Sequence, residues 1–298
     1  MRFLFVDRIV ESAPGAWIRG LKHVTHDDYF LTTDKEGRAC FIPSLIGETL
    51  GQLAAWNVMS LNDFSSRPVA GIVDSARLYR PAYVGETLLL ESHIDSLDER
   101  AVQYHSEARV GSELVFSISG ALGPLLPMDD FIEKSIVREQ FAEINRHTDW
   151  FALCADLNII PMQELLGASN ENRRVNMSFD RICSSEPGIS LIAEKRLSRA
   201  APYFPDHFPK KPVLPMTVLL ECKINLAYEF ILRAGYTTCY QVAELRKIKM
   251  NEFVHPGDVI ECLVTVKRRD EQELVLSFRS TVAGKRVCVM DAVLIPRG

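Results

Sequence analysis

The sequence predicts an α+β protein in which two long apolar helices are each wrapped by a curved antiparallel sheet. One observation behind this prediction is an internal repeat with an offset of 173 residues. A second is that each repeat holds one long apolar segment of helical length, followed by segments that alternate between apolar and polar residues. A helix that is apolar on most faces must be enclosed, and a curved antiparallel sheet can enclose it.

The repeat rests on landmarks that return in one order at nearly one spacing. An Asp-Arg-Ile segment, a Pro-Gly turn, a glutamate in the apolar segment and a hairpin glycine all recur at the same offset, and a Tyr-Phe pair recurs one residue later. The matched residues are Asp7 and Asp180, Pro14 and Pro187, Tyr29 and Tyr203, Glu48 and Glu221, and Gly111 and Gly284.

Each repeat predicts the same order of elements. A short strand ends at the Pro-Gly turn, and a second strand, a long helix, three further strands and a last strand after the hairpin glycine follow. In the second repeat Gly235 is expected to end the helix, because glycine is favoured just after a helix C-terminus. The predicted second strands are 16–24 and 189–197, the helices 45–60 and 217–234, and the later strands of the second repeat 240–250, 258–268, 274–282 and 287–295.

The boundary between the repeats is expected in a connecting region. Residues 129–146 carry apolar side chains at helical spacing, which predicts an amphipathic helix, and 169–174 are polar and predict a loop. We therefore divide the chain into a first unit (1–125), a connecting helix and linker (126–174) and a second unit (175–298).

Composition narrows the class of protein. Of the 298 residues, 47% are hydrophobic and 24% charged, which is typical of a globular protein and argues against disorder. The net charge of -5 argues against nucleic-acid binding, and no run is long enough to span a membrane. Seven scattered cysteines without a Cys-x-x-Cys pair indicate reduced core thiols of a cytoplasmic protein, with no disulfide framework and no metal site.

One motif points to chemistry. His207-Phe208-Pro209 is followed fourteen residues after the histidine by Glu221, across a proline-rich segment and the predicted start of the helix. This pattern resembles the active-site signature of the β-hydroxyacyl-acyl-carrier-protein dehydratases of fatty-acid synthesis. The resemblance spans most of the second unit and, more weakly, the first. It implies the hotdog fold, in which a long helix is wrapped by an antiparallel sheet, and hence a double hotdog, or pseudo-dimer.

In that family the histidine of one hotdog works with the carboxyl residue of its partner. Carried over here, the resemblance pairs His207 with Glu48 in one composite site, with Gln52 supporting the acid one helical turn later. The second site is degenerate, because Glu221 would face Thr33 or Asp34, the first-unit residues at the histidine offset. Neither of these side chains can act as an imidazole base.

The implied reaction is dehydration of a hydroxyacyl thioester. Neutral His207 would remove the α-proton, a protonated Glu48 would give a proton to the leaving hydroxyl, and backbone N–H groups near Met216 would bind the developing enolate oxygen. These acid–base steps need no metal or organic cofactor. The acyl group itself is carried on phosphopantetheine. The expected partner is an acyl carrier protein, or acyl-coenzyme A, and pseudo-dimers could assemble into homo-oligomers.

Two other functions remain open. A hotdog thioesterase would use an acid and a water and would not need the His-Phe-Pro motif. A catalytically inactive hotdog could serve as a scaffold or binding subunit. That alternative stays open because family members usually have glycine where this chain has Lys210 and Met216, and a larger residue restricts the backbone.

Overall fold

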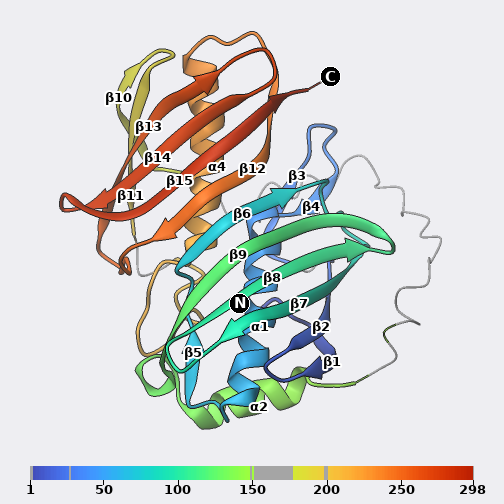
Figure 1. Cartoon of the computed structure of the whole chain (residues 1–298). Helices are drawn as coiled ribbons and strands as arrows, with labels where there is room; N and C mark the ends of the chain where they lie inside the picture. The colour runs from blue at the N-terminus through green and yellow to red at the C-terminus, as the bar shows by residue number, and fades with distance from the viewer. Residues whose placement is uncertain (1–2, 27, 148–149, 151–176, 198–200, 298) are drawn as a thin grey trace.

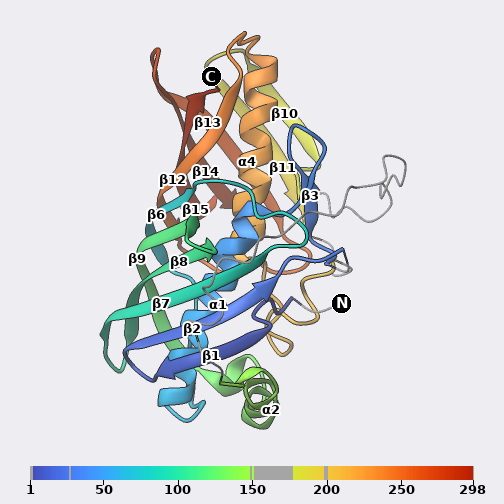
Figure 2. The ribbon, with the colours of Figure 1, turned by 90° about the vertical axis from the view of Figure 1, so that its right-hand side faces the viewer.

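The computed structural model describes residues 3–26, 28–147, 150, 177–197 and 201–297. Its main feature is one 13-stranded antiparallel sheet that curves around two helices, α1 (Pro43–Leu61) and α4 (Met216–Arg233) (Figures 1 and 2). The N-terminal half of the chain surrounds α1 and the C-terminal half surrounds α4 (Figure 1). The hotdog-like arrangement predicted from the sequence, with a large antiparallel sheet around long helices, is therefore present.

The two halves have the same strand order. In the N-terminal half the order is β1-β2-β7-β8-β9-β6, and in the C-terminal half, read from its outer edge, it is β10-β11-β13-β14-β15-β12. The halves join where β6 pairs with β12, with Ala76 opposite Leu245. The strands are β1 Arg8–Ala13, β2 Trp17–His23, β6 Ile72–Leu78, β7 Thr87–Leu97, β8 Ala101–Val110, β9 Glu113–Pro127, β10 Arg181–Glu186, β11 Ser190–Arg196, β12 Tyr240–Met250, β13 Val259–Arg269, β14 Leu274–Val282 and β15 Lys285–Pro296.

The Pro-Gly turns have the backbone shape that the sequence requires. Gly15 and Gly188 both adopt positive φ angles, 80° and 75°, which residues with a Cβ rarely adopt. Each turn reverses the chain between the first two strands of its half, β1 to β2 and β10 to β11. The repeated turn thus places the second strand of each half beside its later strands.

The helices occupy the core because their side chains are apolar on most faces. Leu45, Ile46, Leu50 and Leu53 of α1 are fully buried, and so is Leu219 of α4. The N-terminal turns of α1 and α4 meet, so residues near the start of one helix contact side chains of the other. Gly235 follows the end of α4 with φ 66°, which agrees with the predicted C-terminal stop.

The connecting helix is shorter than predicted. The sequence favoured a helix over 129–146, but the structure has a short 3-10 turn (η1, Met128–Asp130) and then α2 (Lys134–Ile144). Phe131 lies between them with its ring packed 4.6 Å from that of Phe208, and this tertiary contact takes it out of the helix. The predicted polar loop at 169–174 lies outside the described residues.

Three short strands were not predicted. They are β3 (Leu31–Thr33), which pairs with β4 (Ala39–Phe41), and β5 (Ser66–Pro68), which pairs with the end of β9. Each has only three residues, too few to show an alternating pattern in the sequence. β5 follows α1 and lies beside the site described below.

Two further expectations concern cysteines and membranes. Within the described chain Cys183 and Cys239 are exposed, which corrects the prediction that the cysteines are core thiols; Cys183 lies on edge strand β10 and Cys239 in the turn before β12. No cluster of three or more His, Cys, Asp or Glu side chains in the described ranges could hold a metal ion. No helix among those residues is long and apolar enough to cross a bilayer.

Candidate active site

His207 lies in the loop that leads into α4, and its ring has a defined orientation. Its Nδ1 is 3.1 Å from the carbonyl oxygen of Val213. Because a carbonyl oxygen can only accept, Nδ1 carries the proton and Nε2 keeps its lone pair. The neighbouring Phe208 has a positive φ of 62°, rare for a residue with a large side chain, and its ring stacks on the imidazole at 4.3 Å.

The surroundings of His207 favour its neutral form. Burial lowers the pKa of the imidazole below its ordinary value, the charge of Glu48 acts to raise it, and the charge of Arg67 lowers it further. A neutral imidazole with a free Nε2 can accept a proton at neutral pH.

Glu48 comes from the other half of the chain, on α1, and is held at both oxygens. Gln52, one turn further along α1, donates from Nε2 to Oε1 at 3.0 Å. Thr217, in the first turn of α4, donates its hydroxyl to Oε2 at 2.8 Å. The carboxyl group of the N-terminal half is therefore fixed partly by the helix start of the C-terminal half.

Gln52 is itself fixed by the N-terminal segment. Its Oε1 accepts from the backbone N–H of Phe5 at 2.8 Å, and its Nε2 also donates to the carbonyl oxygen of Phe3 at 3.1 Å. These bonds set which end of the amide faces Glu48, so Gln52 presents a donor to the carboxyl group.

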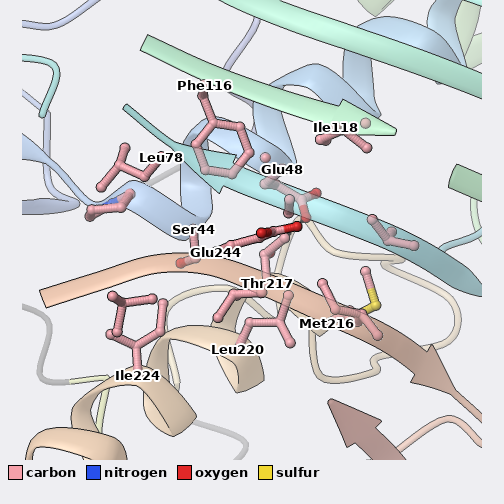
Figure 3. A pocket seen from close by; sticks show the side chains of 18 of the residues that line it. Ser44, Glu48, Leu78, Phe116, Ile118, Met216, Thr217, Leu220, Ile224 and Glu244 are labelled. Carbon is pink, nitrogen blue, oxygen red and sulfur yellow. Dashed lines mark hydrogen bonds between the residues drawn. The ribbon is translucent and has the colours of Figure 1, made fainter. Parts of the chain in front are cut away.

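Glu48 and His207 line the same two cavities. The larger, of about 110 Å³, is called the histidine cavity here, and a smaller one of about 50 Å³ adjoins it. A third cavity of about 140 Å³, called the helix cavity, lies between the first turns of α1 and α4 and strands β6 and β12 (Figure 3). Its walls are mostly apolar, including Leu78, Phe116 and Ile224. Glu48 lines all three, and Met216 lines both the helix and the histidine cavities.

Glu221, the acid nearer to His207 in the sequence, occupies a different place. It is buried, its Oε2 accepts the backbone N–H of Ser44 at 3.4 Å, and burial raises the pKa of its carboxyl group. It is not among the residues that line the three cavities. The structure thus brings Glu48, rather than Glu221, to the cavities that His207 lines.

The other two residues assigned to the degenerate site make local contacts. Thr33 ends the short strand β3. Asp34 accepts hydrogen bonds from the Tyr83 hydroxyl at 2.9 Å and from Arg38, and these bonds hold the pKa of its carboxyl group below the ordinary value against the opposing effect of its partial burial. An aspartate engaged in this way cannot replace an imidazole base.

The sequence did not single out three residues that line these cavities. Thr217 contacts Glu48 directly. The sequence does carry a sign of its importance, because Thr217 and Ser44 are hydroxyl residues that lie 173 residues apart, each at a predicted helix start. Tyr104 lines the helix and histidine cavities, and its raised pKa follows from burial and the charge of Glu48. Arg67 lines both cavities that contain His207 and belongs to no motif.

Known proteins resemble this chain in sequence and in fold. The ApeI-like family, described as ApeI dehydratase, matches residues 184–291. The 3-hydroxyacyl-[acyl-carrier-protein] dehydratase FabZ of Latilactobacillus sakei subsp. sakei is 31% identical over 121 residues, which cover 39% of this chain and 85% of that protein. The protein of the same name from Moorella thermoacetica is 33% identical over 113 residues, covering 38% of this chain and 79% of that protein.

Solved structures show the same fold at much lower identity. The dehydratase domain of PpsC from Mycobacterium tuberculosis, in complex with C12:1-CoA, superposes with a TM-score of 0.55 at 11% identity, covering all of both chains. The 12:0-ACP thioesterase from Umbellularia californica gives 0.53 at 12% identity and covers 94% of each chain.

Fold and site together define a protein of the hotdog class, which includes both dehydratases and thioesterases. Within that class the two sequence relatives identify the family of this chain, because both are more than 30% identical to it over most of their own length. The chain belongs to the family of the 3-hydroxyacyl-[acyl-carrier-protein] dehydratases FabZ.

Proposed function

We propose that this protein removes water from (3R)-hydroxyacyl groups carried on an acyl carrier protein, giving trans-2-enoyl groups in fatty-acid or polyketide-type synthesis. The reaction would take place at one composite site. The observation that carries the proposal is that His207, before α4, and Glu48, on α1, line the same two cavities although they come from different halves of the chain.

The first chemical step assigns the base. The bond from His207 Nδ1–H to the Val213 carbonyl leaves Nε2 free, and burial lowers the pKa of the ring, so the imidazole is neutral and able to accept the α-proton. As the proton moves to Nε2, the electron pair of the C–H bond passes into the thioester as an enolate.

The second step expels water. Glu48, in its protonated form, gives its proton to the β-hydroxyl group, the C–O bond breaks, and the enolate electrons form the new double bond. Gln52 and Thr217 hold the carboxyl group in place for this transfer. The free N–H groups of the first turn of α4, which begins at Met216, provide a positive dipole end beside the same cavity.

The chain is proposed to be a duplicated, double hotdog in which only one of two sites remains active. The support is the 173-residue offset of the landmarks and the identical strand order of the two halves. The proposed units remain 1–125 and 175–298 with a connecting segment at 126–174, although β9 extends two residues past the first limit, to Pro127. Glu221 would then be the acid of the site that lost its histidine.

The proposed substrate carrier is a phosphopantetheine group on an acyl carrier protein or on coenzyme A, and the reaction as written requires no other cofactor. The names of the relatives support a carrier-protein substrate, and the PpsC dehydratase domain was solved with an acyl-CoA. The apolar helix cavity next to Glu48 would receive the acyl chain.

Incubation of the protein with a 3-hydroxyacyl carrier protein, followed by intact-mass measurement, tests the proposal. Dehydration lowers the mass of the acylated carrier by one water. Release of free acid and free carrier thiol would instead identify a thioesterase, the function of one structural neighbour. An unchanged carrier would indicate a scaffold or binding subunit.

A further inference from the structure

Arg67 is a cation that lines the same cavities as Glu48 and His207 and has no hydrogen-bond partner among the residues that the structure describes. It lies on the short strand β5 and lines both cavities that contain Glu48 and His207. Its Nε is buried and makes no hydrogen bond, and the guanidinium has no hydrogen bond or ion pair to any residue in the described ranges. Leaving a buried donor unmatched is costly, so the buried Nε of Arg67 indicates an acceptor that the described residues do not supply.

The guanidinium is nevertheless held in position. Its central carbon lies 4.0 Å from the centre of the Phe208 ring, with the ring of Phe131 at 5.8 Å. Aromatic faces attract the cation but do not accept its in-plane N–H groups, so those donors stay free. Phe208 adopts its unusual positive φ beside His207, so a single strained residue contacts both the imidazole and Arg67.

The position of Arg67 also restricts which part of a substrate it can contact. It does not line the apolar helix cavity, where the acyl chain is proposed to lie. It lines the cavities of His207, the proposed base for the α-proton. The carbonyl oxygen of a thioester is separated from the α-carbon only by the carbonyl carbon, so a group close to the α-proton is also close to that oxygen. Burial lowers the pKa of Arg67 to about 10, so the side chain remains charged at neutral pH.

Building on the proposed dehydration, we infer that Arg67 is a further catalytic residue, whose guanidinium donates hydrogen bonds to the thioester carbonyl oxygen and stabilises the enolate. It would supplement the backbone N–H groups at the start of α4, where Met216 stands in place of the usual glycine. A preorganised donor in a site that excludes water stabilises charge that develops in the transition state more than it stabilises the ground state.

The first test compares Arg67→Gln and Arg67→Lys with the wild type, using 3-hydroxybutanoyl thioesters of N-acetylcysteamine and of phosphopantetheine. Loss of one oxyanion donor typically costs about 100-fold in kcat. R67Q is therefore expected to lose about 100-fold in kcat with both substrates and to change KM little, while R67K keeps the charge and loses less. Arg233→Gln, which removes an exposed arginine paired with Glu229, is the matched control and should behave as the wild type.

A second measurement does not depend on turnover. When trans-2-butenoyl N-acetylcysteamine labelled with ¹³C at the carbonyl carbon binds to the wild type, its resonance is expected to move downfield, and R67Q should remove most of that shift. An equal shift in R67Q, or no shift in the wild type, overturns the role of Arg67 whether or not the protein is a dehydratase. A loss confined to KM for the phosphopantetheine substrate also overturns it, because it would place Arg67 on the phosphate. If the wild type shows no turnover, that result counts against the proposed dehydration. The resonance of the labelled carbonyl carbon then decides the role of Arg67.

Discussion

The hydroxyl group of Thr217 donates a hydrogen bond of 2.8 Å to Glu48, so the first turn of α4 holds the carboxyl group of α1. The reciprocal contact is made by the backbone rather than by a hydroxyl group. The backbone N–H of Ser44, in the first turn of α1, donates to Glu221 of α4 at 3.4 Å. The two helices therefore exchange contacts at their starts, but of the two acids Glu48 lines the three cavities described above and Glu221 lines none of those three.

Thr217→Val should impair catalysis by freeing the carboxyl group of Glu48. Removing a hydrogen bond to a charged or strongly polar group costs about 1.5 kcal/mol, which corresponds to roughly a 10-fold loss in kcat. Ser60→Ala is the control, since Ser60 donates its hydroxyl to the carbonyl oxygen of Asn57 within α1 and lines none of the three cavities. Steady-state kinetics checks both variants, and a wild-type rate for T217V with a reduced rate for S60A would contradict the positioning role of Thr217.

The acid limb of the pH–rate profile should lie below pH 6.5. His207 must be neutral to act as the base, and burial together with the charge of Arg67 lowers its pKa below the ordinary value of 6.5, against the opposing effect of Glu48. Activity is then retained as the pH falls through 6.5 and is lost only lower. The measurement is kcat/KM between pH 4.5 and 8, and a limb at or above 6.5 would show that the imidazole is not in the environment described.

The stability of the fold should depend on Glu221 above pH 4.5. Burial raises the pKa of this carboxyl group above its ordinary value of 4.5. Between that value and the folded pKa the unfolded state binds fewer protons than the native state, so stability falls as pH rises. Up to the folded pKa the slope approaches about 1.4 kcal/mol per pH unit.

Glu221→Gln should therefore be more stable than the wild type at pH 7.5. The difference in the free energy of unfolding between the two proteins should become smaller toward pH 4. Chemical denaturation at both pH values measures the difference in the free energy of unfolding. Glu229→Gln, which changes an exposed acid on the same helix, is the control and should show no such trend. A gap that widens toward acid pH would mean that Glu221 is ionised in the native protein.

Much of the fold followed from residues whose constraints are local. The Pro-Gly turns, Gly235 after α4 and the alternating strands of the second half all appear close to the predicted positions. The 173-residue offset identified Glu48 as the repeat partner of Glu221, and the family resemblance implied that Glu48 is the acid to consider with His207. The structure places Glu48 on the cavities that His207 lines.

Other features depend on tertiary contacts that no local pattern records. Phe131 fitted a helical spacing, yet its packing against Phe208 places it before α2. Arg67 lies on a three-residue strand and acquires its position only when β5 pairs with the end of β9 and the guanidinium stacks on Phe208. Thr217 was visible as the repeat partner of Ser44, but its bond to Glu48 required the relative placement of the two helices.

The composite site is tested most directly by comparing Glu48→Gln with Glu221→Gln, with His207→Ala as the reference for loss of the base. Each protein is incubated with a 3-hydroxyacyl carrier protein, and the rate of water loss is measured by intact mass. General acid–base groups contribute at least about 100-fold, so E48Q and H207A should each lose at least that much, while E221Q stays near the wild type. A wild-type rate for E48Q together with an inactive E221Q would contradict the account.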